Sequence, residues 1–277
     1  MISEKKPIGI FDSGYGGLTI FDNIRRLLPD YDYIYLGDNA RTPYGPRSYE
    51  IVYQFTRQAV MRLFDEGCPL VVLACNTASA KALRTIQQCD LPVSEDPTRR
   101  VLGVIRPTVE VLGSLTRTRH VGILGTAGTI SSGSYTMEIE KLYPDITVTG
   151  ESCPMWVPLV ENWEYDNEGA DYFVKKNINN IFVSDSQIDT LVLGCTHYPL
   201  LEKKIRKYMP EGVALLSQGP YVAESLKDYI SRHPEMACRL SKNRDCRFMT
   251  TEAKEKFSEA ASLFLKRSVD VEQVIIS

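Results

Sequence analysis

The sequence predicts an α/β protein made of two pseudo-symmetric domains, each a mostly parallel sheet flanked by helices, with its site in the cleft between them. Short apolar runs rich in β-branched residues alternate with helical segments, which is typical of parallel sheets covered by helices on both faces. One such run, residues 70–74, is followed directly by Cys75, and another, residues 190–194, by Cys195. Ligands of open α/β sheets bind beyond the carboxyl ends of strands, so both cysteines are candidate site residues.

A second correspondence along the chain indicates two similar halves. Residues 9–13 (GIFDS) match residues 122–126 (GILGT) at an offset of 113 (122 − 9), and the two cysteines are 120 residues apart (195 − 75). Two matches at nearly one offset predict a duplicated unit. We expect residues 1–104 and 212–277 to form the first domain and residues 105–211 to form the second.

The first half contains strands and helices in strict alternation. Apolar runs predict strands, and amphipathic segments predict helices. The strands are expected over residues 7–11, 33–36, 70–74 and 101–104, and the helices over residues 18–28, 49–66 and 78–87. The connection 39–47 is dense in proline and glycine and too long for a plain turn, which favours a loop that lines a site.

The second half continues the alternation and then returns to the first. The expected elements are a helix over 108–115, a strand over 122–126, an apolar segment 153–161 that ends in a carboxylate, a strand over 190–194 and a helix over 200–208. The run 212–219 predicts a strand of the first domain. Two helices (221–231 and 252–266) separated by a polar loop, and an edge strand within 269–276, complete that domain.

Composition and charge narrow the classes of function. The 277 residues carry a net charge of −3, which gives no reason to expect a nucleic-acid or anionic-membrane partner. The N-terminus lacks the apolar core of a signal peptide, and no apolar stretch approaches the roughly 18 residues of a membrane span.

The seven cysteines form neither a CxxC pair nor a Cys/His spacing typical of a metal site. This argues against a disulfide framework and a zinc site, and it favours a reducing, cytoplasmic compartment. Besides Cys75 and Cys195, we interpret the cysteines as small hydrophobic residues or surface thiols. These are Cys68, Cys89, Cys153, Cys238 and Cys246.

Two thiols on opposite sides of one cleft could invert a stereocentre. One thiolate removes a proton from a carbon while the opposite thiol delivers one to the other face, and no cofactor is needed. Because a free cysteine has a pKa of about 8.5, each thiol needs a neighbour that assists its ionisation. Asp12 is the candidate beside Cys75, whereas His197 and Glu161 are the candidates beside Cys195.

The charge that develops on a substrate carboxylate needs buried hydrogen-bond donors. Loops that follow the predicted strands supply hydroxyl, amide and backbone N–H groups at suitable positions. The residues concerned are Ser13, Asn76, Thr77, Thr126, Thr129 and Thr196.

A set of motifs in conserved order closely resembles the glutamate racemases, the cofactor-independent amino-acid racemases of bacterial cell-wall synthesis. The motifs are DSGYGG (12–17), GDNARTPYGPRS (37–48), ACNTAS (74–79), GTAGT (125–129), VPLVE (157–161) and LGCTHYPLL (193–201). The resemblance implies glutamate as substrate, D-glutamate supplied for peptidoglycan, no cofactor or metal, and a homodimer.

The resemblance also implies roles for individual residues. Cys75 and Cys195 would be the acid/base thiols, with Asp12 assisting the first and Glu161 and His197 the second. The implied substrate contacts are Ser13, Pro43, Tyr44, Gly45, Asn76, Thr77 and Thr196. The chain departs from the family pattern at residues 39 and 42, where Asn and Thr replace the more frequent Thr and an aromatic residue, so packing of this loop is expected to differ.

Ordinary structural roles remain open for several of these residues. Asp12 could cap the following helix, His197 could be a satisfied structural histidine, and Glu161 could complement a helix dipole. Tyr44 could serve packing alone. The DSGYGG turn lacks both the GxGxxG spacing and the trailing lysine of phosphate-binding loops.

Three other functions compete with glutamate racemisation. A related racemase could act on aspartate or a hydantoin with the same thiol pair. A catalytically idle binding protein is disfavoured because all five candidate catalytic residues are present. A redox protein with a Cys75–Cys195 disulfide is disfavoured because neither thiol has a close resolving cysteine.

Overall fold

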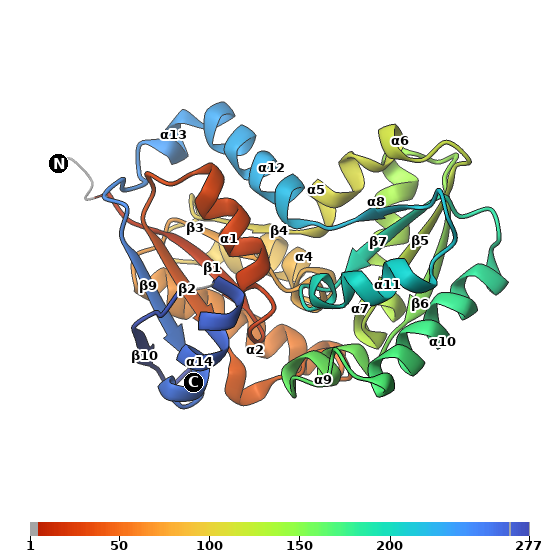
Figure 1. The fold of residues 1–277 in the computed structure, drawn as a ribbon. Coiled ribbons are helices and arrows are strands. Elements are labelled where there is room, and N and C mark those ends of the chain that lie inside the picture. Colours follow the sequence, from red (N-terminus) through yellow and green to blue (C-terminus); the bar gives the residue numbers. More distant parts are fainter. Residues whose placement is uncertain (1–4, 266, 277) are drawn as a thin grey trace.

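The computed structural model describes residues 5–265 and 267–276 and arranges them around two sheets (Figure 1). The strand orders are β10-β9-β2-β1-β3-β4 and β6-β5-β7-β8, and all neighbouring strands run parallel. The first sheet comprises β1 (Ile8–Asp12), β2 (Tyr33–Gly37), β3 (Leu70–Leu73), β4 (Arg100–Gly103), β9 (Cys246–Thr250) and β10 (Val271–Gln273). The second comprises β5 (His120–Gly125), β6 (Thr147–Ser152), β7 (Thr190–Gly194) and β8 (Ala214–Leu216). The predicted fold class is confirmed.

Helices cover both faces of the first sheet because its strands are buried on both sides. Side chains alternate along β1: Ile8 and Ile10 pack on one face, and Phe11 packs on the other. The first face is covered by α1 (Leu18–Leu27), α12 (Gly219–Arg232) and α14 (Lys254–Leu265). The opposite face is covered by α2 (Tyr49–Asp65) and α3 (Asn76–Lys81).

The second sheet is also packed on both faces. One face is covered by α9 (Trp156–Glu161), α10 (Glu168–Ser184) and α11 (Glu202–Tyr208), and the other by α5 (Ile105–Glu110) and α8 (Ser134–Leu142). The shorter helical segments are η1 (Asn39–Arg41), α4 (Leu83–Thr85), η2 (Ile86–Asp90), η3 (Leu91–Val93), α6 (Leu112–Leu115), α7 (Ala127–Ser131), η4 (Tyr198–Leu201) and α13 (Pro234–Ala237). Among the described residues, every helix is too short or too polar to cross a lipid bilayer.

The duplication predicted from the sequence is present in the strand topology. The orders β2-β1-β3-β4 and β6-β5-β7-β8 are the same. Ile10 pairs with Val72 in the first sheet, and Ile123 pairs with Val192 in the second. The offset of 113 relates Ile10 to Ile123, and the offset of 120 relates Val72 to Val192. In each sheet the direction in which successive strands are added therefore reverses once. The reversal lies between β1 and β3 in the first sheet and between β5 and β7 in the second. Such switch points are where α/β sheets bind ligands.

The strand predicted over residues 212–219 exists but joins the other sheet. β8 pairs with β7, where it takes the place that β4 holds in the first sheet. Assigning it to the first domain was wrong because each duplicated unit keeps its own fourth strand. We retain the two-domain division as a proposal and place its second boundary after Leu216.

Several elements were not predicted from the sequence. β9 lies in the stretch interpreted as a polar loop, and that interpretation is wrong, since β9 pairs with both β2 and β10. β6 is an edge strand with a polar sequence and no fully buried residue, so its pattern carries little signal. The helices α8 and α10 were also missed. The helix expected from residue 78 begins at Asn76 because Cys75 occupies its N-cap.

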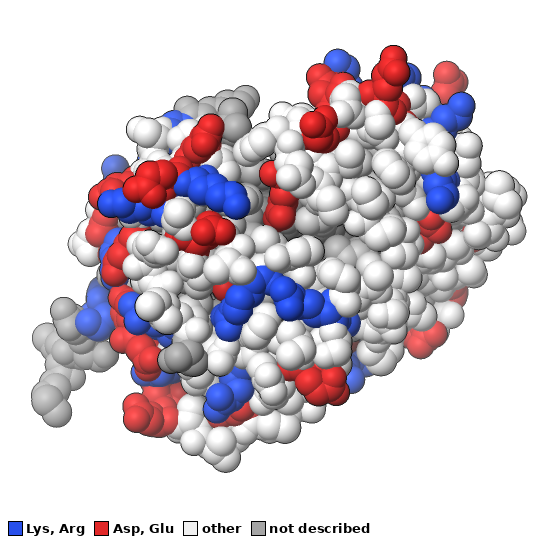
Figure 2. Space-filling view, turned by 90° about the horizontal axis from the view of Figure 1, so that it is seen from below, with Lys and Arg blue, Asp and Glu red and all other residues white. Residues whose placement is uncertain are grey.

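Charges of both signs are mixed on the face of the molecule seen from below. Figure 2 shows acidic and basic side chains intermingled over the half built on the first sheet, while the other half is mostly uncharged on this face. This mixture agrees with the net charge of −3. The described part of this face therefore presents no extended field of one sign.

Candidate active site

The two switch points open onto one cavity between the sheets. Ser13 follows β1, Cys75 follows β3, Thr126 follows β5 and Cys195 follows β7, and all four line a cavity of about 130 Å³. A water molecule needs roughly 10–15 Å³ of such space, so the cavity is large enough for a small organic molecule. The candidate active site thus takes matching contributions from both halves of the duplication.

Most of the residues singled out in the sequence line this cavity. They are Ser13, Pro43, Tyr44, Gly45, Cys75, Asn76, Thr77, Thr126, Cys195, Thr196 and His197. Asp12, Glu161 and Thr129 lie behind the lining, and each is hydrogen-bonded to a residue that belongs to it. The predicted residues are therefore brought together, although their roles stay predictions.

One wall of the cavity was missed. It is mainly apolar, and much of it comes from the residues that follow β6 and from the first turn of α9. The lining residues without a sequence prediction are Thr42, Pro46, Ala127, Cys153, Pro154, Val157 and Pro158. Cys153 was interpreted as an ordinary thiol and is fully buried, but it also borders the cavity. The sequence marked the segment 153–161 as apolar and the loop 39–47 as one that lines a site, but it did not single out these residues, because the strand β6 that leads into Cys153 was not predicted.

Cys75 is held as the N-cap residue of α3. Its Sγ accepts a hydrogen bond from the backbone N–H of Ala78 at 3.4 Å and lies 3.4 Å from the hydroxyl of Ser13. Burial, together with the nearby charge of Asp12, raises the pKa of the Cys75 thiol to about 12. These surroundings therefore favour the neutral thiol.

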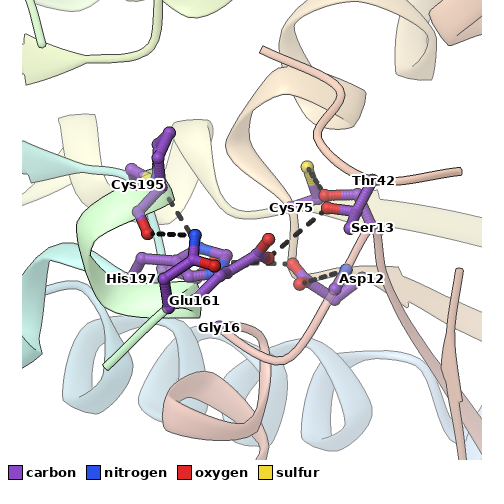
Figure 3. A network of polar contacts seen from close by, with 12 residues as sticks. Asp12, Ser13, Gly16, Thr42, Cys75, Glu161, Cys195 and His197 are labelled. Carbon is purple, nitrogen blue, oxygen red and sulfur yellow. Dashed lines mark hydrogen bonds and ion pairs between the residues drawn. The ribbon is translucent and has the colours of Figure 1, made fainter. Parts of the chain in front are cut away.

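Cys195 lies in a different environment, at one end of a hydrogen-bonded relay. Its Sγ is 3.8 Å from Nδ1 of His197, and Nε2 of the same ring is 3.0 Å from Oε1 of Glu161 (Figure 3). Burial alone would lower the pKa of His197, but its bonds to Cys195 and Glu161 outweigh burial and hold that pKa well above its usual value. A protonated imidazole in this position balances the charge of a Cys195 thiolate.

The structure argues against the helix-dipole alternative for Glu161, while the role of His197 stays a prediction. Glu161 is the last residue of α9, where the helix dipole is negative, so a favourable dipole interaction cannot explain its position. Its partners are His197 and the hydroxyl of Thr42, which donates to Oε1 at 3.4 Å. Both ring nitrogens of His197 face a group able to exchange or share a proton.

Asp12 is not a helix cap. The N-cap of α1 is Gly17, whereas the buried carboxylate of Asp12 accepts the backbone N–H of Gly14 at 3.0 Å and the hydroxyl of Thr196 at 3.5 Å. Burial raises the pKa of Asp12, and the positive charge of His197 opposes that shift. The hydrogen-bond partner of Cys75 is Ser13, so assistance from Asp12 stays a prediction.

Hydroxyl groups from both halves meet at another part of the lining. The Oγ1 atom of Thr77 is 2.9 Å from that of Thr126 and 3.3 Å from that of Thr129, and the last two are 3.1 Å apart. Tyr44 lines the cavity while its hydroxyl donates to Asp38, so it serves both packing and the site. These groups give the cavity polar contacts without a carboxylate in its lining.

The glycines of the DSGYGG turn allow the first half to touch the relay in the second. A Cβ atom on Gly16 would lie 2.5 Å from Nδ1 of His197, and one on Gly14 would lie 2.8 Å from Oε1 of Glu161. The adjoining Thr19 donates its hydroxyl to the carbonyl of Thr196 at 3.1 Å. The turn is therefore an inter-domain contact, which explains its glycines without a phosphate ligand.

Comparison with known proteins agrees with this geometry. The family model described as Asp/Glu/Hydantoin racemase matches residues 8–226. The chain belongs to this family. It is therefore an amino-acid racemase, an isomerase. Within the described residues, no three His, Cys, Asp or Glu side chains are grouped as a metal ion would require.

The chain is similar to curated glutamate racemases over most of their length. The chain is 36% identical to the glutamate racemase of Ruegeria sp., covering 96% of this chain and 98% of the relative. It is 41% identical to the glutamate racemase of Oceanobacillus iheyensis, and the match covers 83% of this chain and 81% of the relative. The crystal structure of a Bacillus anthracis glutamate racemase isoform superposes with a TM-score of 0.88 at 34% identity, covering 98% of each chain.

A racemase variant, Glu161→Gln, tests the relay. Loss of the carboxylate charge is expected to lower the pKa of His197, which NMR can follow because the sequence has only three histidines. A raised pKa means that protonated His197 stabilises the fold below the unfolded pKa of about 6.5, and that this stability is lost as pH rises through the folded pKa. When pH is raised, this loss in the free energy of unfolding should therefore begin at a lower pH in Glu161→Gln than in the wild type. An unchanged His197 titration would contradict the relay.

Proposed function

We propose that this chain interconverts L-glutamate and D-glutamate by proton transfer at Cα between two thiols, without a cofactor. The observation that carries the proposal is the position of Cys75 and Cys195. Each follows the equivalent strand of its own sheet, and both border the same cavity from opposite sides (Figure 3). A substrate between them has one face of Cα toward each sulfur.

The reaction needs one base and one acid at a time. A thiolate on one side takes the Cα proton and becomes a thiol, and the electron pair left on carbon delocalises into the substrate carboxylate. The thiol on the other side then donates its proton to the opposite face of Cα and becomes a thiolate. One proton leaves and one arrives, so the configuration is inverted and the thiols have exchanged roles.

The two thiols begin from unequal positions. His197, held by Glu161, balances negative charge on Cys195, whereas burial and the charge of Asp12 keep the proton on Cys75. We therefore propose that turnover in one direction starts with Cys195 as the base and Cys75 as the acid. Turnover in the other direction starts from the opposite state, in which the proton has moved to Cys195.

Stabilisation of the carbanion falls to the polar lining. Its electron pair spreads onto the α-carboxylate, whose growing charge needs donors already in place. The hydroxyls of Thr77 and Thr126, the amide of Asn76 and the hydroxyl of Ser13 border the cavity for this purpose. Because these polar side chains are buried, such hydrogen bonds are stronger than in solvent.

Glutamate is the substrate best supported by the relatives. A Francisella tularensis glutamate racemase, 32% identical with a TM-score of 0.85, has been solved in complex with D-glutamate. An Escherichia coli glutamate racemase, 26% identical with a TM-score of 0.74, has been solved with L-glutamate and an activator. These similarities support glutamate over aspartate or a hydantoin. Supply of D-glutamate for peptidoglycan, a homodimer and a cytoplasmic location remain part of the proposal.

Incubation of each glutamate enantiomer in deuterated water tests the proposed function. We expect deuterium at Cα of the inverted product, one atom per inversion, with no added pyridoxal phosphate or metal. Chiral analysis of parallel incubations with L-aspartate provides the matched comparison. Turnover of aspartate alone would remove the glutamate assignment, and inversion without solvent deuterium would remove the two-thiol mechanism.

A further inference from the structure

A closed ring of hydrogen bonds lies next to the cavity and has no part in the mechanism described so far. Nε2 of Gln218 donates to the hydroxyl of Tyr135 at 2.9 Å. That hydroxyl donates to Oδ1 of Asn76 at 2.7 Å, and Nδ2 of Asn76 donates to Oε1 of Gln218 at 2.6 Å. Each member both gives and receives one bond, so the three bonds run in one direction and strengthen one another.

The ring is buried and anchored. Asn76, Tyr135 and Gln218 are each at most 3% exposed. Nε2 of Gln218 also donates to Oγ1 of Thr108 at 2.7 Å, and that hydroxyl donates to the carbonyl of Val104 at 2.7 Å. In an interior with few competing donors, the ring fixes which end of the Asn76 amide is oxygen and which is nitrogen.

Its members come from both halves of the molecule and from the connections between them. Asn76 begins α3 in the first half, directly after Cys75, and Tyr135 lies in α8 beside the second sheet. Gln218 lies in the connection from β8 to α12, and Thr108 lies in α5, shortly after the chain leaves β4. The ring therefore forms only when the two sheets hold this relative position.

Only one member of the ring reaches the cavity. Asn76 is part of the lining, whereas Tyr135 and Gln218 are not. After the ring is closed, the Asn76 amide keeps one N–H and one oxygen lone pair for a ligand. Any influence of Tyr135 and Gln218 on the substrate therefore passes through Asn76.

We propose that Tyr135 and Gln218 are positioning residues of the racemase, which orient the Asn76 amide toward the substrate and link that orientation to the relative position of the two sheets. This inference rests on the proposed function, because it requires a substrate that contacts Asn76. The ring sets one polar contact of the cavity in advance, so that binding does not have to order it.

The variant Tyr135→Phe tests the proposal by removing one hydroxyl. It leaves Oδ1 of Asn76 without its donor and frees the amide to rotate. Because the Asn76 amide is no longer held in one orientation and a buried acceptor is left unpaired, we expect kcat/KM for glutamate to fall about 5- to 100-fold, chiefly through KM. The matched control is Tyr143→Phe, at the C-cap of the same helix, where the hydroxyl donates to the carbonyl of Glu110 and is remote from the cavity. Its kinetics should equal those of the wild type.

A double-mutant cycle distinguishes positioning from general structural support. In the Asn76→Ala background, Tyr135→Phe should cause no further loss of kcat/KM, because the residue through which it acts is gone. An equal loss in both backgrounds, or an unchanged KM in Tyr135→Phe, would overturn the inference. If Tyr135→Phe does not fold, Gln218→Met breaks the same ring from another side and must give the same signature. Wild-type protein that does not racemise glutamate would instead refute the proposed function.

Discussion

Replacing either Cys75 or Cys195 by alanine is expected to abolish racemisation while the protein stays folded. Each thiol is acid in one direction and base in the other, so loss of one interrupts both directions. General acid–base groups contribute about 10²–10⁴ to rate, and we expect kcat to fall at least about 10³-fold in each variant. Both side chains are small, and each borders the cavity as well as its hydrophobic cluster, so truncation to alanine should leave the fold intact. Chiral chromatography measures the loss, and thermal unfolding checks the fold.

The matched control is Cys68→Ala, which removes another buried thiol. The pKa of Cys68 is raised to about 12 by burial, as for Cys75, but Cys68 packs in the first domain away from the cavity. The Cys68→Ala variant should therefore racemise glutamate at about the wild-type rate. Either active-site variant that keeps near-normal racemisation would rule out the two-thiol mechanism. Residual exchange of the Cα proton of one enantiomer, without inversion, would show which face the remaining thiol serves.

The sequence predicted those parts of the molecule whose local pattern is strong. The strands that carry Cys75 and Cys195 are fully buried runs of β-branched and aliphatic residues, and such runs are readable without tertiary information. The repeat offsets then placed both thiols at equivalent strand ends, which the parallel registers of β1 with β3 and of β5 with β7 bear out.

Parts that depend on tertiary context were not predicted. β9 has only five residues, begins with Cys246 and Arg247, and becomes a strand because it fits between β2 and β10. β6 is an edge strand with a polar sequence, so it lacks the alternation of apolar and polar residues from which a strand can be predicted. Without β6, neither the cavity wall beyond it nor the position of Cys153 could be placed.

Contacts between the halves were equally out of reach of the sequence. Glu161 was a candidate credited mainly by resemblance, because its spacing says nothing about His197, which lies 36 positions further along. Thr42 was noticed only as a departure from the family pattern, yet it donates to Glu161 across the cleft. Gln218 was not singled out at all, since a glutamine in a loop is usually solvated. Such residues acquire their function from the way the two sheets are placed.

Gly16→Ala is expected to impair racemisation severely although the substituted residue touches no substrate. A Cβ atom at this position would lie 2.5 Å from both Nδ1 of His197 and Oγ1 of Thr196, far inside van der Waals contact. Relief requires His197 to move by about 1 Å or the halves to separate, and misplacement of that size can cost about 10²-fold in rate. We therefore expect kcat/KM for glutamate to fall about 10²-fold.

The loss should arise from the contact and not from backbone strain. Gly16 is not among the residues with a positive φ, so alanine fits its conformation and the turn itself can form. The free energy of unfolding should change little, while Cys195 becomes more reactive toward an alkylating reagent as the halves are pushed apart.

Gly14→Ala should show a smaller effect, because the nearest atom, Oε1 of Glu161 at 2.8 Å, ends a flexible side chain. The exposed Gly169→Ala serves as the control, since its nearest neighbour is 3.2 Å away and remote from the relay. If Gly16→Ala turned over glutamate as fast as Gly169→Ala, the DSGYGG turn could not be the surface that positions the Cys195 relay.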